Sequence, residues 1–186
     1  MNKTEALTLL RENIKNENMI KHCIASGAVM AALAQKLGTD AEVWRNAGIL
    51  HDIDVEAAAL KGDLMKTHCT LARALLAGKL PEESICAIEA HNESADIRPR
   101  ASMFDHALAA GETITGLITA TAYVYPDRKL ASVKVKSITK RMKEKSFAAS
   151  VSRENIMECE KLGIPLEDFA ALALKAMQDI AGELGL

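Results

Sequence analysis

The chain has 186 residues and a formal net charge of −2, and 49% of its residues are hydrophobic although only 3% are aromatic. This length fits one domain with a single core, so we expect one domain spanning 1–186. The small net charge excludes a general attraction to nucleic acid or to an anionic membrane, so a charged ligand has to be recognised locally. A core with few aromatic residues must be built from Ala, Leu, Ile, Val and Met, a composition that favours helices.

The four cysteines show neither C-x-x-C spacing nor the density of a disulfide-rich protein. The first residues, MNKTEALTLLRENIKN, are polar rather than signal-like. No segment approaches the roughly 18 uninterrupted apolar residues that a membrane span requires. We therefore expect a cytoplasmic protein with reduced thiols and no membrane segment.

Helical periodicity recurs along the whole chain together with cap and stop signals, and no stretch alternates with the period of a strand. The predicted fold class is therefore all-α. In chain order, the predicted helices cover 3–14, 18–37, 40–50, 64–77, 81–91, 102–124, 133–145, 152–162 and 165–183. Gly38, Gly78 and Gly163 end three of these helices, and 92–100 and 125–129 are expected to be loops.

Three histidines, His22, His68 and His91, are predicted to point inward from three different helices, because their neighbours at helical spacing are mostly apolar. A single buried histidine is usually satisfied by a backbone carbonyl. Here His51 and Asp52 also stand side by side where a hydrophobic run ends. Burying so many polar groups without a shared partner is costly, and a metal ion that accepts imidazole and carboxylate ligands is the economical partner.

The order of His22, the pair His51-Asp52 and a later acid resembles the HD superfamily of metal-dependent phosphohydrolases, in its small single-domain HDIG form. The similarity runs from KHCIASGAVMAALAQKLG through AGILHDID to DHALAAGETITGLITATAYV. It implies a helical bundle around a metal centre. Where the family usually has Asp ahead of Thr-Gly, this chain has Glu112, whose longer side chain can still reach an ion. The alternative for Glu112 is an acid hydrogen-bonded to a neighbouring helix.

Resemblance to the superfamily branches with two metals also gives His68 and His91 a role. It implies that Asp52 bridges two ions, which can be Fe, Mn, Zn or Ni. The remaining ligands would be His22, His51 and Glu112 for one ion and His68 and His91 for the other.

Two further residues stay outside this ligand set. His106 lies six residues before Glu112, which places it roughly 120° around the same helix, so we expect a surface or supporting role. Asp54 is expected either to contact solvent at the helix end or to support a ligand.

Two metal ions that share one carboxylate can clamp a phosphoryl oxygen and lower the pKa of a bridging water from about 15.7 toward neutrality. The leading interpretation is therefore hydrolysis of a small phosphorylated molecule or nucleotide, with Asp52 and His51 as catalytic residues. Arg98 and Arg100 either bind the remaining phosphate charge or belong to an ordinary solvated loop.

Segment 128–145 carries eight basic residues and one acid. It is predicted to be either a solvated face or a phosphate-binding wall beside the metals. Nucleic acid is the less expected partner, because the segment lacks aromatic residues on which bases stack.

Two other functions share the ligand set, namely a mixed-valent di-iron oxygenase and a non-catalytic metal-binding module. The sequence leaves the oligomeric state open.

Overall fold

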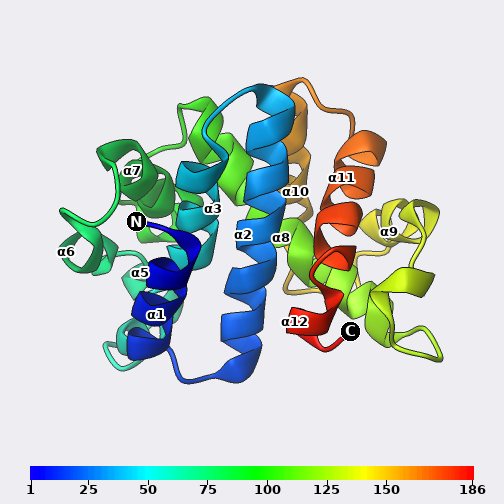
Figure 1. Ribbon diagram of the computed structural model, residues 1–186, viewed down its shortest axis with the longest axis horizontal. Helices are drawn as coiled ribbons and strands as arrows, with labels where there is room; N and C mark the ends of the chain where they lie inside the picture. The colour runs from blue at the N-terminus through cyan, green and yellow to red at the C-terminus, as the bar shows by residue number, and fades with distance from the viewer.

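The computed structural model describes residues 1–186, which form helices and no strand (Figure 1), so the all-α prediction is confirmed. The α-helices are α1 (Lys3–Asn13), α2 (Glu17–Leu37), α3 (Ala41–Leu50), α4 (Val55–Ala59), α5 (Leu64–Thr67), α6 (Ala72–Leu76), α7 (Glu82–His91), α8 (Met103–Tyr123), α9 (Val135–Met142), α10 (Arg153–Met157), α11 (Leu166–Gln178) and α12 (Ala181–Leu184). Three short 3₁₀ segments are η1 (Glu93–Ala95), η2 (Leu130–Ser132) and η3 (Glu158–Leu162).

Polar caps fix where the first three helices begin. The side chains of Asn2, Asn16 and Asp40 accept hydrogen bonds from the first backbone amides of α1, α2 and α3. Gly38 ends α2 in the left-handed conformation, with φ of 71°. These local signals explain why the predicted boundaries of the first three helices agree with the observed ones to within one residue.

The two longest helices, α2 and α8, pack against each other in the middle of the molecule (Figure 1). Helix α3 packs on α2, and α7 packs on α8. One connected cluster of buried aliphatic residues and a few aromatic ones fills the space between these helices. The core therefore draws on both ends of the chain and holds α2, α3, α7 and α8 in fixed relative positions.

Helices α2 and α3 cross with their backbones in contact. A Cβ atom added to Gly48 would lie 2.8 Å from the Ser26 carbonyl oxygen and 2.9 Å from Gly27 Cα, and a Cβ on Gly27 would lie 3.1 Å from the Arg45 oxygen. Only glycine fits so close an approach. The crossing lies one to two helical turns from His22 on α2 and one turn from His51 at the end of α3, so it brings these two histidines together.

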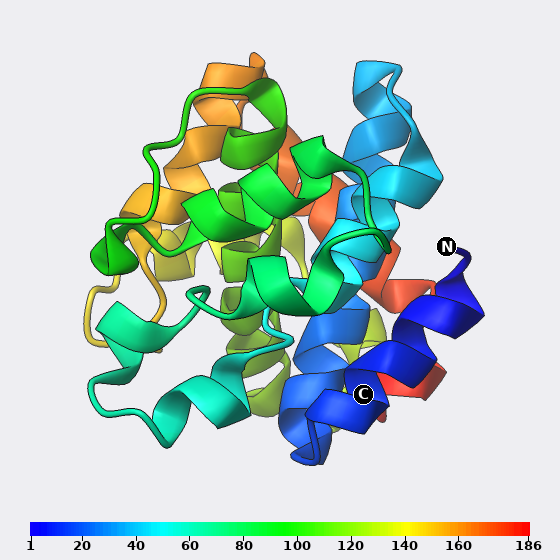
Figure 2. The same cartoon turned by 90° about the vertical axis from the view of Figure 1, so that its left-hand side faces the viewer.

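Segment 64–77, predicted as one helix, is instead two short helices joined by a turn at residues 68–71, on the side that Figure 2 turns toward the viewer. His68 has extended backbone angles and Cys69 has a positive φ of 78°. Leu64 and Met65, which the helical pattern assigns to the core, are exposed. His68 therefore points inward because of the turn, and not because of a buried helix face.

The remaining differences are smaller. The predicted helix 133–145 is observed only over α9, the prediction for 152–162 continues from α10 into a 3₁₀ segment, and 165–183 divides into α11 and α12. A short helix, α4, was not predicted. None of the helices is both long enough and apolar enough to cross a membrane.

Candidate metal centre

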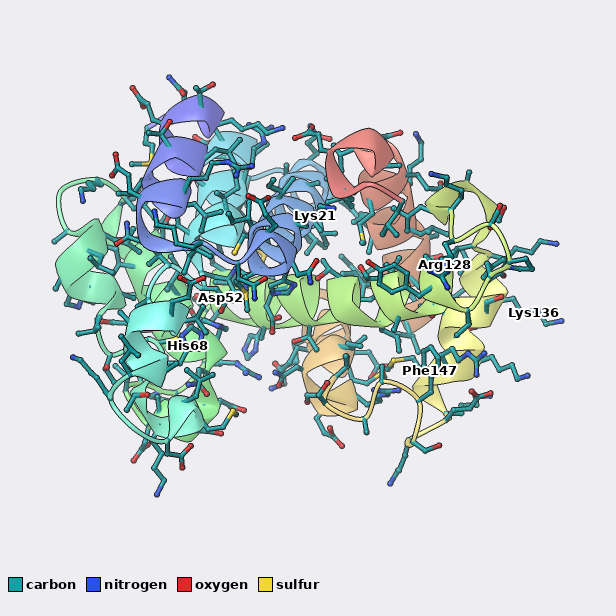
Figure 3. The ribbon with its side chains drawn as sticks, turned by 90° about the horizontal axis from the view of Figure 1, so that it is seen from below. Lys21, Asp52, His68, Arg128, Lys136 and Phe147 are labelled. Carbon is teal, nitrogen blue, oxygen red and sulfur yellow. The ribbon has the colours of Figure 1, made fainter.

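The structure brings all six predicted ligands into one region, although they come from five separate helices or helix ends. His22 lies on α2, Glu112 lies on α8, and His91 is the last residue of α7. His51 and Asp52 directly follow α3, and His68 caps α5. Figure 3 shows Asp52 and His68 close together at one end of the molecule.

Asp52 lies at the middle of the centre, and its two oxygens face different histidines. Oδ2 is 3.2 Å from His51 Nε2 and 3.5 Å from His22 Nε2. Oδ1 is 2.9 Å from His68 Nε2 and 3.6 Å from His91 Nε2. The carboxylate therefore joins two pairs of imidazoles, one pair on each oxygen.

The Nδ1 atom of each of these four histidines is held by another group of the protein. The partners are Thr115 Oγ1 for His22 (3.0 Å), Gly48 O for His51 (2.8 Å), Asp54 Oδ1 for His68 (2.7 Å) and Ile88 O for His91 (2.7 Å). A carbonyl or carboxylate oxygen can only accept, so Nδ1 carries the proton at three of the histidines. At His22 the Thr115 hydroxyl donates to the Glu112 carbonyl oxygen, which leaves its own oxygen free to accept from Nδ1. In the neutral form that binds a metal, the Nε2 lone pair of each of the four histidines is thereby directed at the centre.

The spacing of the Nε2 atoms fits metal coordination. Two nitrogens bound to one ion at about 2.0–2.1 Å lie about 2.9–3.4 Å apart when their angle at the ion is between 90° and tetrahedral. The Nε2 atoms of His22 and His51 are 3.1 Å apart, and those of His68 and His91 are also 3.1 Å apart. Each pair therefore has the separation of two ligands on a common ion.

Glu112 extends the pair formed by His22 and His51. Its Oε2 atom lies 3.8 Å from His22 Nε2, and the three residues offer donor atoms close enough for one ion. The other carboxylate oxygen accepts a hydrogen bond from the Thr113 hydroxyl. Side-chain exposure is 1% for His51, 15% for Glu112 and 25% for His22, so the centre opens to solvent on the side of α2 and α8.

The electrostatics of the centre favour positive charge. Burial by itself would raise the pKa of Asp52, but the charge of His51 and hydrogen bonds from three histidines hold this pKa well below its usual range. Burial by itself would lower the pKa of His68, but hydrogen bonds to Asp52 and Asp54 raise it to about 12. Carboxylates that retain a proton on a neighbouring imidazole so strongly also attract a metal cation.

Asp54 supports the centre from behind. It is fully buried and accepts hydrogen bonds from the backbone amides of Cys69 (3.1 Å) and Leu71 (3.0 Å), in addition to its contact with His68. Asp54 thus holds both the His68 ring and the turn that carries it. Of the two roles expected for Asp54, the structure has the supporting one.

Four groups near the centre were not predicted, and one of them is Cys23, which forms a cluster with His51 and Asp52 that can hold a metal ion. Thr115 holds the ring of His22. Lys21 precedes His22, and both residues line a cavity beside the centre. Cys69 Sγ lies 3.5 Å from His91 Nδ1 and belongs to a cluster with His68 and His91 that can hold a metal ion. A sequence signal existed for Lys21 and Thr115, which flank or face a predicted ligand on a helix, but the position of Cys69 depends on its left-handed turn.

Arg100, one of the two arginines predicted to bind substrate, is instead bound to the backbone at the end of α7. Arg100 donates to the carbonyl oxygens of Ala90 and His91, at 3.2 Å and 2.7 Å, and its side chain is only 4% exposed. It therefore caps the C-terminal end of α7 and is not available to a phosphate. Arg98 lies close enough to Glu82 to contribute, after the larger effect of Arg73, to lowering the pKa of that carboxylate. The substrate-binding role of Arg98 stays a prediction.

His106 and the basic segment also lie apart from the centre. His106 pairs with Glu158 and contacts none of the predicted ligands. Lys136, Lys140 and Lys143 are exposed, and Figures 1 and 3 place α9 at the end of the molecule farthest from Asp52 and His68. The basic segment is a solvated face and does not line the metal centre.

Comparison with known proteins agrees with this geometry. The HD domain family model matches residues 19–122, a range that contains His22, Glu112 and every predicted ligand between them. The chain is also similar to Ribonuclease Y of Symbiobacterium thermophilum, with 30% identity over 165 residues, covering 85% of this chain and 30% of that protein. The chain thus aligns with less than a third of that relative's length. No solved structure matches the chain.

The family match covers more than half of the chain, and its bounds enclose the converging histidines and Asp52. The chain belongs to the HD domain family, which is part of the superfamily of metal-dependent phosphohydrolases. Family membership and the clustered donor atoms together support a divalent-metal site at this centre.

Proposed function

We propose that this protein is a phosphohydrolase with a dinuclear metal centre, which acts on a small phosphorylated molecule. The observation that carries the proposal is the arrangement around Asp52, where each carboxylate oxygen faces two histidine Nε2 atoms and every Nδ1 atom is anchored. In this proposal Asp52 would offer one carboxylate oxygen to each ion. The other ligands are His22, His51 and Glu112 on one side and His68 and His91 on the other.

The anchored rings explain how the chain itself prepares the site. Each histidine ring is held in one orientation before a cation arrives, so binding does not require a search over ring orientations. Asp54 adds a negative charge behind His68 and makes this imidazole a stronger ligand. Divalent ions held here would supply a hydroxide nucleophile at neutral pH and neutralise phosphate charge, which is the chemistry of phosphoester hydrolysis.

The open side of the centre indicates where a substrate enters. His22 is the most exposed of the four histidines, and it borders a solvent-accessible cavity between α2 and α8. On the closed side, His51 and His91 are buried in the core. A phosphate would therefore approach Asp52 past His22 and Glu112.

A small substrate is proposed in preference to RNA, although the relative from Symbiobacterium is a ribonuclease by name. The basic face that an RNA backbone would follow lies at the other end of the molecule, on α9. The cavity beside His22 contains a single lysine and no arginine. These features fit an anion of low charge.

The test is hydrolysis of an aryl phosphate by protein purified without chelators, with metal content and an optical spectrum recorded on the same sample. We expect phosphate release that stops on chelation and returns when Mn²⁺ or Zn²⁺ is added. A sample with two irons, a visible charge-transfer band and oxygen consumption, but no phosphate release, would contradict the proposal and favour the oxygenase. Cleavage of RNA without cleavage of monoesters would contradict the choice of a small substrate.

A further inference from the structure

A cavity of about 350 Å³ lies directly beside the metal centre, and the ligand assignment does not use it. Its wall on α2 includes Asn18, Lys21 and His22, its wall on α8 includes Tyr123, and the C-terminal residues close a third side. His22 belongs both to this cavity and to the cluster around Asp52. The cavity therefore opens onto the metal centre.

The cavity lining offers a cationic side chain and no carboxylate side chain, which suits a phosphate ester. Lys21 is the only lysine or arginine among the lining residues, and the cavity is bordered by no aspartate or glutamate. Half of the lining residues are hydrophobic, among them Ala25, Ala120 and Leu184. A cation beside an apolar wall suits a ligand with one anionic end and one apolar end.

Tyr123 provides the aromatic surface of this cavity. Tyr123 is 55% exposed at the end of α8, so its ring is accessible to a ligand. Figure 3 shows Lys21 beside the C-terminal helix, and the Lys21 ammonium group lies near Gly185 of that segment. A phosphate bound beside His22 would have both Lys21, the neighbouring residue on α2, and the Tyr123 ring within the same cavity.

We infer that this cavity is the subsite for the organic part of the substrate, and that Lys21, the lysine of its lining, binds a phosphate oxygen. The inference rests on the proposed function. The ligand is a phosphate monoester of a compact, uncharged and partly apolar alcohol. A second charged group on the alcohol, such as another phosphate, would find no partner among the lining residues and would lose affinity.

Lys21 and the apolar wall make separable contributions to binding. Two matched ligands measure the contribution of the apolar wall, and variants of Lys21 measure that of the lysine. Phenylphosphonate and methylphosphonate carry the same anionic group and are not hydrolysed, and they differ in the ring. We expect the metal-loaded protein, titrated by calorimetry, to bind phenylphosphonate at least tenfold more tightly than methylphosphonate, because the ring is buried against apolar side chains.

The variants then divide the two contributions. Ala120→Phe fills the cavity and should remove the preference for the phenyl ligand while leaving methylphosphonate affinity within about twofold. Tyr123→Ala, at an exposed position where folding is not at risk, should reduce the same preference. Lys21→Met should weaken both ligands by about tenfold, through the loss of a charge-assisted hydrogen bond, and Lys21→Arg should restore most of the affinity.

Two controls make the result specific. Ala32→Phe adds the same ring in a different cavity on α2, lined by Ala28 and Ala31, and should change neither affinity. Metal content measured on each variant should equal that of the wild type, which shows that the effect of a Lys21 substitution does not come from a displaced His22.

Equal affinity of the wild type for the two phosphonates, or a phenyl preference that survives in both Ala120→Phe and Tyr123→Ala, would overturn the subsite while leaving the proposed function intact. A metal-loaded protein that binds neither phosphonate would contradict both.

Discussion

The carboxylate of Asp54 lies 2.7 Å from His68 Nδ1, and the same side chain accepts hydrogen bonds from the backbone of the turn that follows His68. One buried acid therefore fixes both the orientation of a proposed metal ligand and the path of the chain beside it. The second ion of the proposed centre depends on this acid, although Asp54 is not itself among the proposed ligands.

Replacing Asp54 with Asn should weaken the half of the centre that contains His68 and His91. We expect a 10- to 100-fold loss of affinity for one of the two ions, because the imidazole loses the anionic partner that strengthens it. The free energy of unfolding should also fall by about 1–3 kcal/mol, since one backbone amide of the turn loses its acceptor. Chelator competition and denaturant unfolding measure the two effects.

Asp63→Asn is the matched control, because Asp63 caps α5 in the same segment and touches no ligand. Asparagine caps a helix about as well as aspartate, so this variant should bind both ions as the wild type does. Equal metal affinity in the two variants would remove Asp54 from the account of the centre.

Gly48→Ala should damage the crossing of α2 and α3. The added methyl group would lie 2.8 Å from the Ser26 carbonyl oxygen and 2.9 Å from Gly27 Cα. Both are backbone atoms, which cannot rotate away. We expect a loss of about 1–3 kcal/mol or more in the free energy of unfolding, and weaker metal binding as His22 and His51 move apart. In Gly182→Ala, by contrast, the new methyl group meets nothing within 4 Å, and this variant should be neutral or slightly more stable. Thermal melting of the two variants side by side decides whether the close crossing matters.

Glu112 is the position where the chain departs from the family pattern, and two substitutions separate its possible roles. Glu112→Gln keeps the volume and removes the charge, so metal affinity should fall at least tenfold if Glu112 is a ligand. Glu112→Asp should reduce metal affinity less. Glu112 Oε2 lies 3.8 Å from His22 Nε2, and the shorter aspartate side chain would place its oxygens farther away. Unchanged metal affinity in Glu112→Gln, with a lower melting temperature that added metal does not restore, would identify Glu112 as a structural acid.

Asp52 and His106 provide a contrast in activity. Asp52→Ala should abolish phosphate release, because this carboxylate contacts all four histidines of the centre. His106→Ala breaks only the pair with Glu158 and should keep most of the activity. Circular dichroism has to show that both variants are folded. Comparable losses of activity in the two would mean that the proposed ligand set is wrong.

The sequence predicted the fold class and most helix boundaries because the signals for them are local. Asn16 and Asp40 cap the helices that follow, and Gly38 ends α2 in a conformation that other residues adopt at a cost. The inward position of His22 was likewise readable from its own helix, because Val29 and Leu33, at helical spacing from it, are apolar, and both are buried in the structure.

The turn after His68 was not predictable in the same way. The spacing of Leu64, Met65 and Leu71 favours a continuous helix, and nothing local opposes it. In the structure, the Asp54 carboxylate captures two amides that a helix would otherwise pair, and this competition depends on a residue well separated in the chain. The same reason applies to Arg100, whose phosphate-binding role was inferred from its place in a loop, whereas the carbonyl groups at the end of α7 bind its guanidinium.

The number of ions bound per chain tests the central claim most directly. Elemental analysis of protein purified without chelators and reloaded with Mn²⁺ or Zn²⁺ should give two ions per chain for the wild type. His68→Ala and His91→Ala should each retain one, because the pair of His22 and His51 on the other oxygen of Asp52 is undisturbed. A wild-type protein that holds a single ion under the same conditions, with His68→Ala and His91→Ala holding as much as the wild type, would contradict the dinuclear centre.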